Sequence, residues 1–229
     1  MKTSSIFSFA FKLRYHLFLL LPSVVILMTA CSSESIEIDS PETGNYPVAK
    51  AIDLGLPSGT KWASWNVGAS KPEEYGGYYA WGETEEKDYY DWSTYIYCDG
   101  SSSTCHHIGD DIAGTEYDVA HVKWGGSWRI PTRAQQDELR KNCTREWTQL
   151  NGVNGIKVSG PNGNTIFLPA AGYRWSGDLF DEGKCGDYWL SSFDPYHEYY
   201  ACDLYFYSSS WYWGSDGRDY GVSVRAVCP

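Results

Sequence analysis

Alternating apolar and polar side chains mark the first foldable part of the chain. Ile52, Leu54 and Leu56 alternate with polar or small residues, and a Pro-Ser-Gly turn at residues 57–59 separates them from a second apolar stretch at residues 62–67. A period of two is typical of a strand with one buried face, and proline and glycine favour turns. The pattern predicts an antiparallel hairpin between residues 48 and 69.

One segment in the middle of the chain has convincing helix signals. Thr132 follows a proline, Gln135 stands three residues further on, and the pattern continues to Asn142, with Cys143 at the last turn. Thr followed by Gln at this spacing is typical of a capping box. The aromatic and acidic residues 75–97 show no sustained period, so we expect an irregular loop packed by aromatic rings there.

The second half of the chain contains several short strand patterns. Residues 151–158 and 162–168 predict two strands around a Gly-Pro-Asn-Gly turn, and a serine turn at residues 208–210 separates two further strands. Val222, Val224 and Val227 mark a last strand. Short antiparallel strands, one or two helices and long irregular loops predict an α+β domain.

The first 30 residues resemble a secretory leader. They hold Lys2, Lys12 and Arg14 with no acidic residue, followed by an apolar run over residues 17–28. The run is shorter than the roughly 20 residues that a membrane-spanning helix needs, and Pro22 interrupts it. We therefore expect a cleaved signal peptide at residues 1–30 and no permanent transmembrane helix.

The end of the leader indicates lipid attachment. Met28, Thr29 and Ala30 precede Cys31, and this junction resembles a bacterial lipobox, in which the cysteine is acylated. The alternative is an ordinary signal peptide with a coincidental cysteine. Residues 31–47 are polar and acidic, with too little apolar mass to fold, and are expected to form a tether. The globular domain is then residues 48–229, which is enough for one core.

The net charge of the chain argues against some classes of binding partner. The sequence has 18 Lys and Arg against 29 Asp and Glu, a net charge of −11, and removal of the leader lowers it to about −14. Such a surface repels phosphate backbones and anionic lipids. We expect no nucleic-acid partner, and membrane contact through the lipid anchor only.

Six cysteines remain when Cys31 is set aside, and they allow 15 pairings. An even number in an exported chain predicts disulfides. Cys98 and Cys105 bracket a turn of small residues whose ends can meet, so we expect a local disulfide there. No CxxC pair occurs and the chain has five histidines, which argues against a zinc site.

Several blocks of the sequence carry a family resemblance. They are DLGLPSGTKWAS at residues 53–64, EYGGYYAWGET at 74–84, SWRIPTR at 127–133, IFLPAAGYR at 166–174, YW at 188–189, SS at 191–192 and GVSVR at 221–225. The chain resembles Bacteroidetes lipoproteins with a Fibrobacter succinogenes major paralogous domain. The resemblance covers nearly all of the domain.

The resemblance implies a C-type-lectin-like architecture, shared with formylglycine-generating enzymes. In that fold the last strand returns beside the helix, which implies a disulfide between Cys143 and Cys228 and leaves Cys185 with Cys202. Cys202 and Cys228 do not stand in the late cysteine motif of those enzymes. The calcium-binding triplets of sugar-binding C-type lectins are also missing from the sequence.

Other groups that could carry chemistry have simpler explanations. His106 and His107 follow Cys105 and could assist a thiolate, but exposed histidines beside a loop disulfide explain them as well. The acidic pairs at residues 73–74, 85–86 and 110–111 could serve acid–base chemistry or calcium binding, but adjacent loop carboxylates usually face solvent. We expect no catalytic residues, no metal site and no cofactor.

Tyrosine is concentrated between residues 193 and 221, among serines and glycines. Antibody combining sites use the same residues, because tyrosine offers a large amphipathic surface at low entropic cost. Alternation points Tyr205, Tyr207 and Tyr212 outward, while Leu204, Phe206, Trp211, Trp213 and Trp189 are expected in the core. The predicted ligand-binding residues are Tyr196, Tyr199, Tyr200, Tyr205, Tyr207, Tyr212, Asp216 and Tyr220. The alternative is that these aromatics only fill a small core.

These observations favour a lipid-anchored binding or adhesion module on the outer membrane, exposed at the cell surface. Its ligand would be a glycan or a protein of another cell or host surface, held by the tyrosine-rich C-terminal face. Two alternatives stay open. One is a structural envelope lipoprotein without a specific ligand, and the other is a degenerate enzyme of the formylglycine-generating type.

Overall fold

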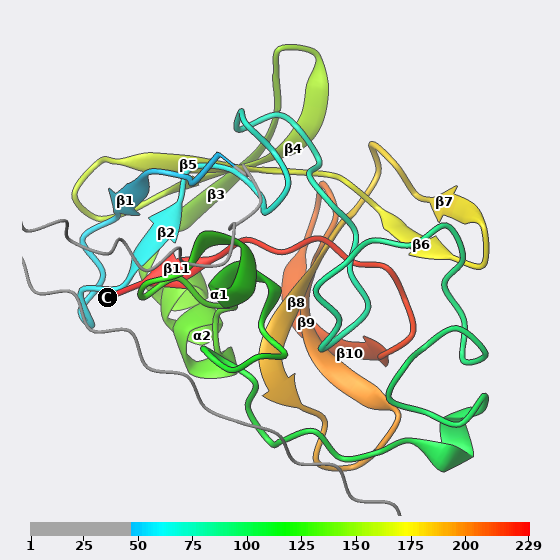
Figure 1. The fold of residues 1–229 in the computed structure, drawn as a ribbon. Coiled ribbons are helices and arrows are strands. Elements are labelled where there is room, and N and C mark those ends of the chain that lie inside the picture. Colours follow the sequence, from blue (N-terminus) through cyan, green and yellow to red (C-terminus); the bar gives the residue numbers. More distant parts are fainter. Residues whose placement is uncertain (1–46) are drawn as a thin grey trace, which may run out of the picture. The chain divides into compact units, whose positions relative to one another are not determined.

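The computed structural model describes residues 47–229, in which short strands outnumber helices (Figure 1). The helices are α1 (Val119–Trp124) and α2 (Arg133–Asn142), with a 3-10 turn η1 (Ser102–Thr104). The strands are β1 (Ala51–Asp53), β2 (Lys61–Ala63), β3 (Thr144–Leu150), β4 (Val153–Ser159), β5 (Thr165–Pro169), β6 (Tyr173–Trp175), β7 (Asp178–Phe180), β8 (Gly186–Phe193), β9 (Tyr200–Phe206), β10 (Trp211–Gly217) and β11 (Val227–Cys228). The predicted signal peptide, Cys31 and almost all of the tether lie outside the described residues.

The strands form four small sheets, ordered β1-β2-β11, β3-β4-β5, β6-β7 and β8-β9-β10. Every pairing between named strands is antiparallel. The expected α+β class is therefore confirmed at this level. Between residues 47 and 229, no helix has the length and apolar character needed to cross a membrane.

The predicted hairpin at the start of the domain is present. Ala51 pairs with Ala63, and Gly59 has a left-handed φ of 78°, which glycine adopts without strain at the turn between the strands. Val227 of β11 pairs with Trp62, so the end of the chain completes the first sheet. Figure 1 shows the red C-terminal segment reaching β2.

The predicted helix is α2, and its start follows the sequence signal. The Thr132 hydroxyl accepts from the Gln135 backbone N–H at 3.2 Å, and the Gln135 side chain accepts from the Thr132 N–H at 3.0 Å. This reciprocal capping box satisfies two amide groups that a helix start otherwise leaves free. Helix α1 was not predicted; Asp118 caps it, accepting from Ala120 and His121.

In the β3-β4-β5 sheet, two of the three strands were predicted from the sequence. β4 and β5 match the predicted strands, whereas β3 was missed. Asn151 and Gly152 both have positive φ, at 50° and 87°, in the turn between β3 and β4. Asn-Gly is the strongest short hairpin signal, and it would have predicted β3.

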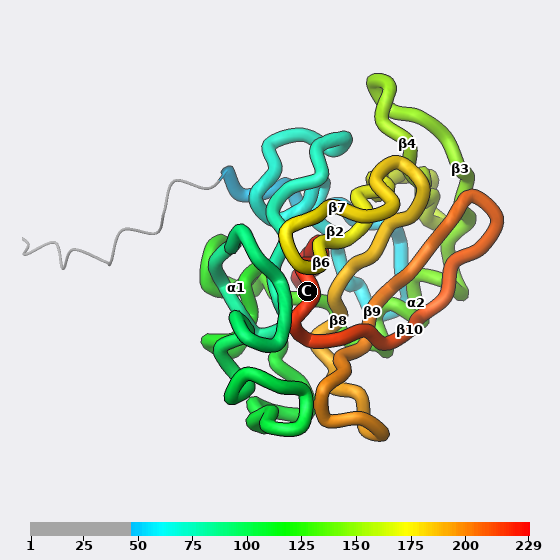
Figure 2. The backbone as a smooth tube through the Cα atoms, turned by 90° about the vertical axis from the view of Figure 1, so that its right-hand side faces the viewer, coloured from blue at the N-terminus to red at the C-terminus, as the bar shows by residue number. Residues whose placement is uncertain are grey.

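The β8-β9-β10 sheet has two different faces. Tyr188, Leu204 and Phe206 are buried on one face, in an apolar cluster that also contains Leu139 of α2 and Leu168 of β5. On the other face the pairings place acidic and tyrosine side chains of all three strands together. Figure 2 shows the β9-β10 hairpin along one margin of the domain, with β6-β7 close to β8.

One predicted core residue of this sheet is exposed. Trp213 retains 36% of its accessible surface, because β10 is the edge strand and no further strand covers it. Its ring lies against the Arg133 guanidinium, whose central carbon is 3.3 Å from the ring centroid. Leu204, Phe206 and Trp189 are buried as predicted.

One of the three predicted disulfides is present. Cys98 and Cys105 form the expected local disulfide. Cys143, Cys185, Cys202 and Cys228 are free thiols, so the two long-range pairings implied by the family resemblance are wrong.

The strand geometry explains why the long-range pairs do not form. Gly186 pairs with Phe206, which places Cys185 about 15 Å along the ladder from Cys202, far beyond the roughly 7 Å that a disulfide spans between Cα atoms. Val227 packs in the same cluster as Cys143, and the next residue of the strand, Cys228, therefore points to the opposite face.

Candidate functional site

The acidic and aromatic face of the β8-β9-β10 sheet is the candidate site. Tyr205 pairs with Tyr212 on β10 and with Asp187 on β8, and Asp203 pairs with Gly214. Paired residues of an antiparallel sheet project to the same side. The predicted outward direction of the three tyrosines is therefore correct, and acidic residues share their face.

The tyrosines of this face line a cleft of about 390 Å³, which we call the tyrosine cleft. Its lining residues are Tyr173, Asp203, Tyr205, Tyr207, Tyr212, Gly214, Ser215, Asp216 and Tyr220. Edge-to-face contact holds Tyr205 against Tyr207, with ring centroids 4.8 Å apart, and Tyr173 stacks on Tyr220 at 5.7 Å. The rings are thus held by one another and form a preformed aromatic wall.

A second cleft of about 450 Å³ adjoins the first, and we call it the tryptophan cleft. It is lined by Asp91, Trp92, Ser93, Gly100, Ser102, Trp175, Ser176, Tyr199, Tyr200, Asp216, Gly217, Asp219 and Tyr220. Asp216 and Tyr220 line both clefts, so the two hollows meet at these side chains. Together they extend from β10 to the loop around Trp92 and to β6.

Seven of the eight predicted ligand-binding residues line these clefts. Tyr205, Tyr207 and Tyr212 line the tyrosine cleft, Tyr199 and Tyr200 line the tryptophan cleft, and Asp216 and Tyr220 line both. Tyr196 lines neither cleft; it lies in the loop between β8 and β9 with 84% of its surface exposed. The structure thus groups all but one of the predicted residues.

Three carboxylates lie together beneath the tyrosine cleft, and we call them the aspartate cluster: Asp187, Asp203 and Asp216. Each offers an oxygen, and these oxygens lie within 4.8 Å of one another. Asp216 was predicted as a site residue, whereas Asp187 and Asp203 were missed. Alternation could have found Asp203, because it stands two residues before Tyr205 on the same face.

Burial changes the acidity of the aspartate cluster. Asp187 and Asp203 are almost completely inaccessible to solvent, and loss of hydration raises the pKa of both carboxyls, that of Asp203 to about 7. Repulsion from Asp216 raises both pKa values further, because like charges oppose ionisation, whereas a hydrogen bond with Asp187 lowers the pKa of Asp203. Burial also raises the pKa of Asp216.

A fourth carboxylate, Asp219, lies at the floor of the tryptophan cleft. It is fully buried, and neither of its carboxylate oxygens has a hydrogen-bond partner. Burial raises the pKa of Asp219 to about 7. Two fully buried carboxylates therefore lack a donor group within the described chain: Asp219, which lines the tryptophan cleft, and Asp187, which lines neither cleft but lies beside Asp203 and Asp216.

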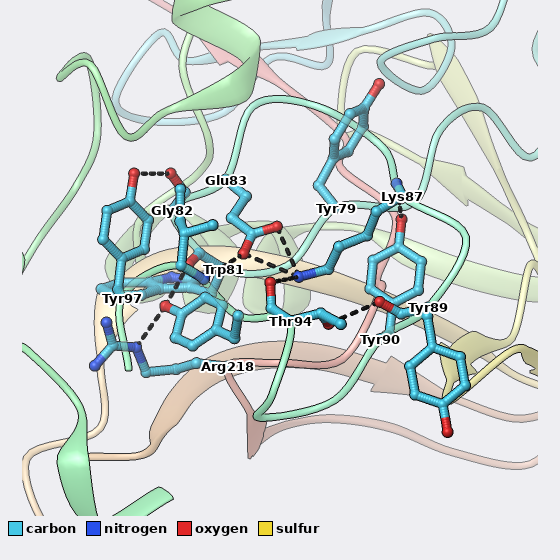
Figure 3. Close-up of polar contacts among 12 residues, drawn as sticks. Tyr79, Trp81, Gly82, Glu83, Lys87, Tyr89, Tyr90, Thr94, Tyr97 and Arg218 are labelled. Carbon is cyan, nitrogen blue, oxygen red and sulfur yellow. Dashed lines mark hydrogen bonds and ion pairs between the residues drawn. The ribbon is translucent and has the colours of Figure 1, made fainter. Parts of the chain in front are cut away.

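Polar contacts connect residues of the aromatic loop at residues 75–97 with one another and with Arg218 (Figure 3). Lys87 donates to the Glu83 carboxylate at 2.9 Å and to the Thr94 carbonyl at 3.0 Å. Arg218 donates to the Tyr95 hydroxyl at 2.9 Å, and its carbonyl accepts from the Trp81 N–H. Arg218 immediately precedes Asp219, so these contacts fix the cleft floor against the loop.

The domain was compared with known protein families, curated proteins and solved structures. The chain matches no family model, no curated protein and no solved structure at a significant level.

The other candidate groups lie outside the clefts. His106 and His107 are exposed and lie beside Asp99 and Asp110, with nitrogen–oxygen distances of 3.3 and 3.4 Å. Glu85 forms an ion pair with Lys123, and the Glu86 carboxylate accepts from the Tyr78 N–H. The acidic pairs are thus engaged in loop contacts, and none of them joins the aspartate cluster.

Proposed function

We propose that this protein is a lipid-anchored binding module of the bacterial cell surface that recognises a glycan through its two clefts. The leader, Cys31 and the acidic tether support the anchor and the location. The family resemblance supports a C-type-lectin-like arrangement of the α+β domain. The aromatic face formed by the last third of the chain is where such a domain would present its ligand site.

The observation that carries this proposal is that the tyrosine face is hollowed. Clefts of about 390 and 450 Å³ lie in the size range of small-ligand sites, whereas a stable protein partner commonly covers about 800 Å² on each side. Sugar rings present apolar C–H faces that stack on aromatic rings, and hydroxyls that donate to carboxylates. Tyr212, Trp175 and Asp216 supply these two kinds of contact.

The acidic lining selects among glycans. Asp91 and Asp219 line the tryptophan cleft, Asp203 lines the tyrosine cleft, and Asp216 lines both. Neither cleft has a lysine or arginine in its lining. An anionic sugar would be repelled by this field. The proposed ligand is therefore a neutral glycan or one that carries amino groups.

The free thiols favour binding over the enzyme alternative. Burial raises the pKa of Cys202 to about 11 and also raises that of Cys228. The thiolate is the nucleophilic form of cysteine, so a thiol that stays protonated near neutral pH reacts slowly. A structural role without a ligand would leave the two adjoining clefts unexplained.

The test is a glycan-array screen with the full-length chain in detergent. Tyr212→Ala and Trp175→Ala each remove an exposed ring from one cleft, with 43% and 46% of the side chain accessible. We expect either variant to lose about tenfold or more in affinity, since removal of an aromatic anchor commonly costs more than about 1 kcal/mol. Tyr196→Ala is the matched control and should bind as the wild type does.

Three results would contradict the proposal. The first is a wild-type chain, shown to be folded by circular dichroism, that retains no glycan. The second is a Tyr196→Ala variant that loses as much affinity as Tyr212→Ala. The third is release of new reducing ends from a bound glycan, which would identify an enzyme.

A further inference from the structure

The aspartate cluster brings together one carboxylate from each strand of the β8-β9-β10 sheet. Asp203 on the central strand pairs with Gly214 on β10 and Trp189 on β8. Asp216 and Asp187 each stand two residues from these partners and point to the same face. The strand ladder therefore fixes the three side chains, whose oxygens lie within 4.8 Å of one another.

The carboxylate of Asp187 has no donor group as a partner in the described chain, and its polar neighbours are the acidic side chains of Asp203 and Asp216. Its side chain is fully buried, and neither oxygen accepts a hydrogen bond. One oxygen of Asp203, which is 2% exposed, also lacks a donor. None of the ion pairs found between residues 47 and 229 includes these three carboxylates. Burying an ionised carboxylate without compensation costs several kcal/mol, so a positive charge at this point would relieve a large penalty.

A glycine keeps space open beside the cluster. A Cβ atom at Gly214 would lie 2.7 Å from Oδ1 of Asp203, closer than such atoms approach in proteins. The φ of Gly214 is not positive, so its backbone does not require glycine. The absence of a side chain at residue 214 therefore leaves room beside the Asp203 carboxylate.

We infer that Asp187, Asp203 and Asp216 bind a divalent metal ion of the hard, oxygen-preferring class, with Ca²⁺ the best match. All the available ligand atoms are carboxylate oxygens, which suit Ca²⁺, Mg²⁺ or Mn²⁺ and not the softer metals. Ca²⁺ bonds to oxygen at about 2.3–2.6 Å, so oxygens on opposite sides of one ion stand about 5 Å apart. Three oxygens within 4.8 Å of one another therefore lie within the span that one Ca²⁺ ion bridges.

The burial of Asp187 excludes larger cations. An organic amine entering from the tyrosine cleft can reach Asp203 and Asp216, which line that cleft, but Asp187 has no accessible surface. A bare ion can bridge all three carboxylates, and its remaining coordination positions then face the cleft and its water. The inference concerns the metal alone and holds whether or not the clefts bind a glycan.

The experiment titrates the full-length chain, in detergent and near neutral pH, with CaCl₂, MgCl₂ and MnCl₂ by calorimetry. We expect the wild type to bind Ca²⁺ with a Kd of about 10⁻⁴–10⁻³ M, the range of extracellular calcium modules. Asp187→Asn keeps the shape of the side chain and removes one ligand charge, so its affinity should fall roughly tenfold or more. The control is Asp178→Asn, an exposed aspartate of β7 outside the cluster, which should bind Ca²⁺ as the wild type does.

A second variant guards against misfolding of the first. Gly214→Ala places a methyl group against Oδ1 of Asp203, and only the end of a side chain has to move, so the fold should persist while Ca²⁺ affinity falls. Thermal unfolding with and without Ca²⁺ gives an independent reading. Ca²⁺ should raise the Tm of the wild type and of Asp178→Asn, and raise that of Asp187→Asn much less.

Two outcomes would overturn the inference. One is a folded wild-type chain that binds none of the three metals at up to about 10 mM, well above the expected Kd; the carboxyls would then hold protons only. The other is an Asp187→Asn variant that binds Ca²⁺ as tightly as the wild type does. Either result leaves the glycan proposal to its own test.

Discussion

Buried charged residues of this domain are of two kinds, those whose polar atoms are hydrogen-bonded and those whose polar atoms have no partner. Arg225 is fully buried, yet its guanidinium donates to the Asn66 side chain and to the carbonyls of Ala63 and Phe167, at 2.8–3.1 Å. Asp219 is equally buried, and neither of its oxygens has a partner. An unpaired buried carboxylate destabilises a fold, and such groups persist mainly where a ligand or an ion uses them.

Replacement of Asp219 should change how the stability of the fold depends on pH. Burial raises the folded-state pKa to about 7 from an ordinary value of 3.8, so the folded chain holds a proton that the unfolded chain releases between these pH values. The contribution of Asp219 to stability is therefore greatest below about pH 3.8 and is lost as the pH rises toward 7. Asp219→Asn removes the ionisation and should stabilise the fold at pH 8 by about 1–3 kcal/mol, with little gain at pH 4.

Urea unfolding of both proteins across this pH range measures the difference. Asp178→Asn, at an exposed position, should show no such trend. A stability difference that stays constant with pH would mean that Asp219 does not titrate within the fold.

At the scale of elements, the sequence predicted those whose signals are local. The hairpin of β1 and β2 follows from alternation around a Pro-Ser-Gly turn, and α2 follows from its capping box. Helix α1 has only six residues, too few for a helical period to show. β3 was missed because residues 144–150 were assigned to no element, although the Asn151-Gly152 turn follows them directly.

The site was predictable in part for the same reason. Alternation along β9 and β10 correctly predicted that Tyr205, Tyr207 and Tyr212 lie on one face of the sheet. The aspartate cluster depends on the register between three strands, which a single sequence does not specify before the strands are paired. The exposure of Trp213 was missed because periodicity gives the direction of a side chain but not whether another element covers it.

The capping box of α2 gives an element-scale prediction. Thr132→Ala removes the hydroxyl that accepts from the Gln135 N–H, and should lower the free energy of unfolding by about 1 kcal/mol. Ser101→Ala is the matched control, because Ser101 precedes η1 without making a side-chain cap, and its effect should stay within about 0.5 kcal/mol. Chemical denaturation of the three proteins gives the values. Equal losses in both variants would show that the cap does not stabilise α2.

At the scale of the whole domain, the segment after β10 connects parts that are distant in sequence. Val222 exchanges backbone hydrogen bonds with Tyr79, the Val224 carbonyl accepts from Val67, and Val227 exchanges bonds with Arg129. Figure 1 traces this segment in red from β10 to β11. Through it the cleft-bearing sheet, the aromatic loop and the first sheet are held together, so the clefts depend on the domain as a whole.

Arg225 is the residue of this segment on which the connection depends most. Burial lowers its pKa to about 10, which still leaves it protonated near neutral pH. Arg225→Met fills similar space but leaves the Asn66 side chain and two carbonyls without their donor, at about 1–3 kcal/mol for each unsatisfied group. We expect a loss of more than about 3 kcal/mol, and a measurable loss in Arg225→Lys as well, because an ammonium does not reproduce the planar fork.

Thermal and urea unfolding should show that both Arg225 variants still unfold in one transition, at lower temperature and lower urea concentration. Arg145→Lys is the control, because the Arg145 hydrogen bond to the Ser209 carbonyl is exposed to solvent and its loss should be nearly neutral. A stability of Arg225→Met equal to that of the wild type would mean that the apolar packing of the last segment holds the sheets together by itself. A two-step transition would mean instead that the β3-β4-β5 sheet, which Arg225 reaches through the Phe167 carbonyl, unfolds separately once that bond is lost.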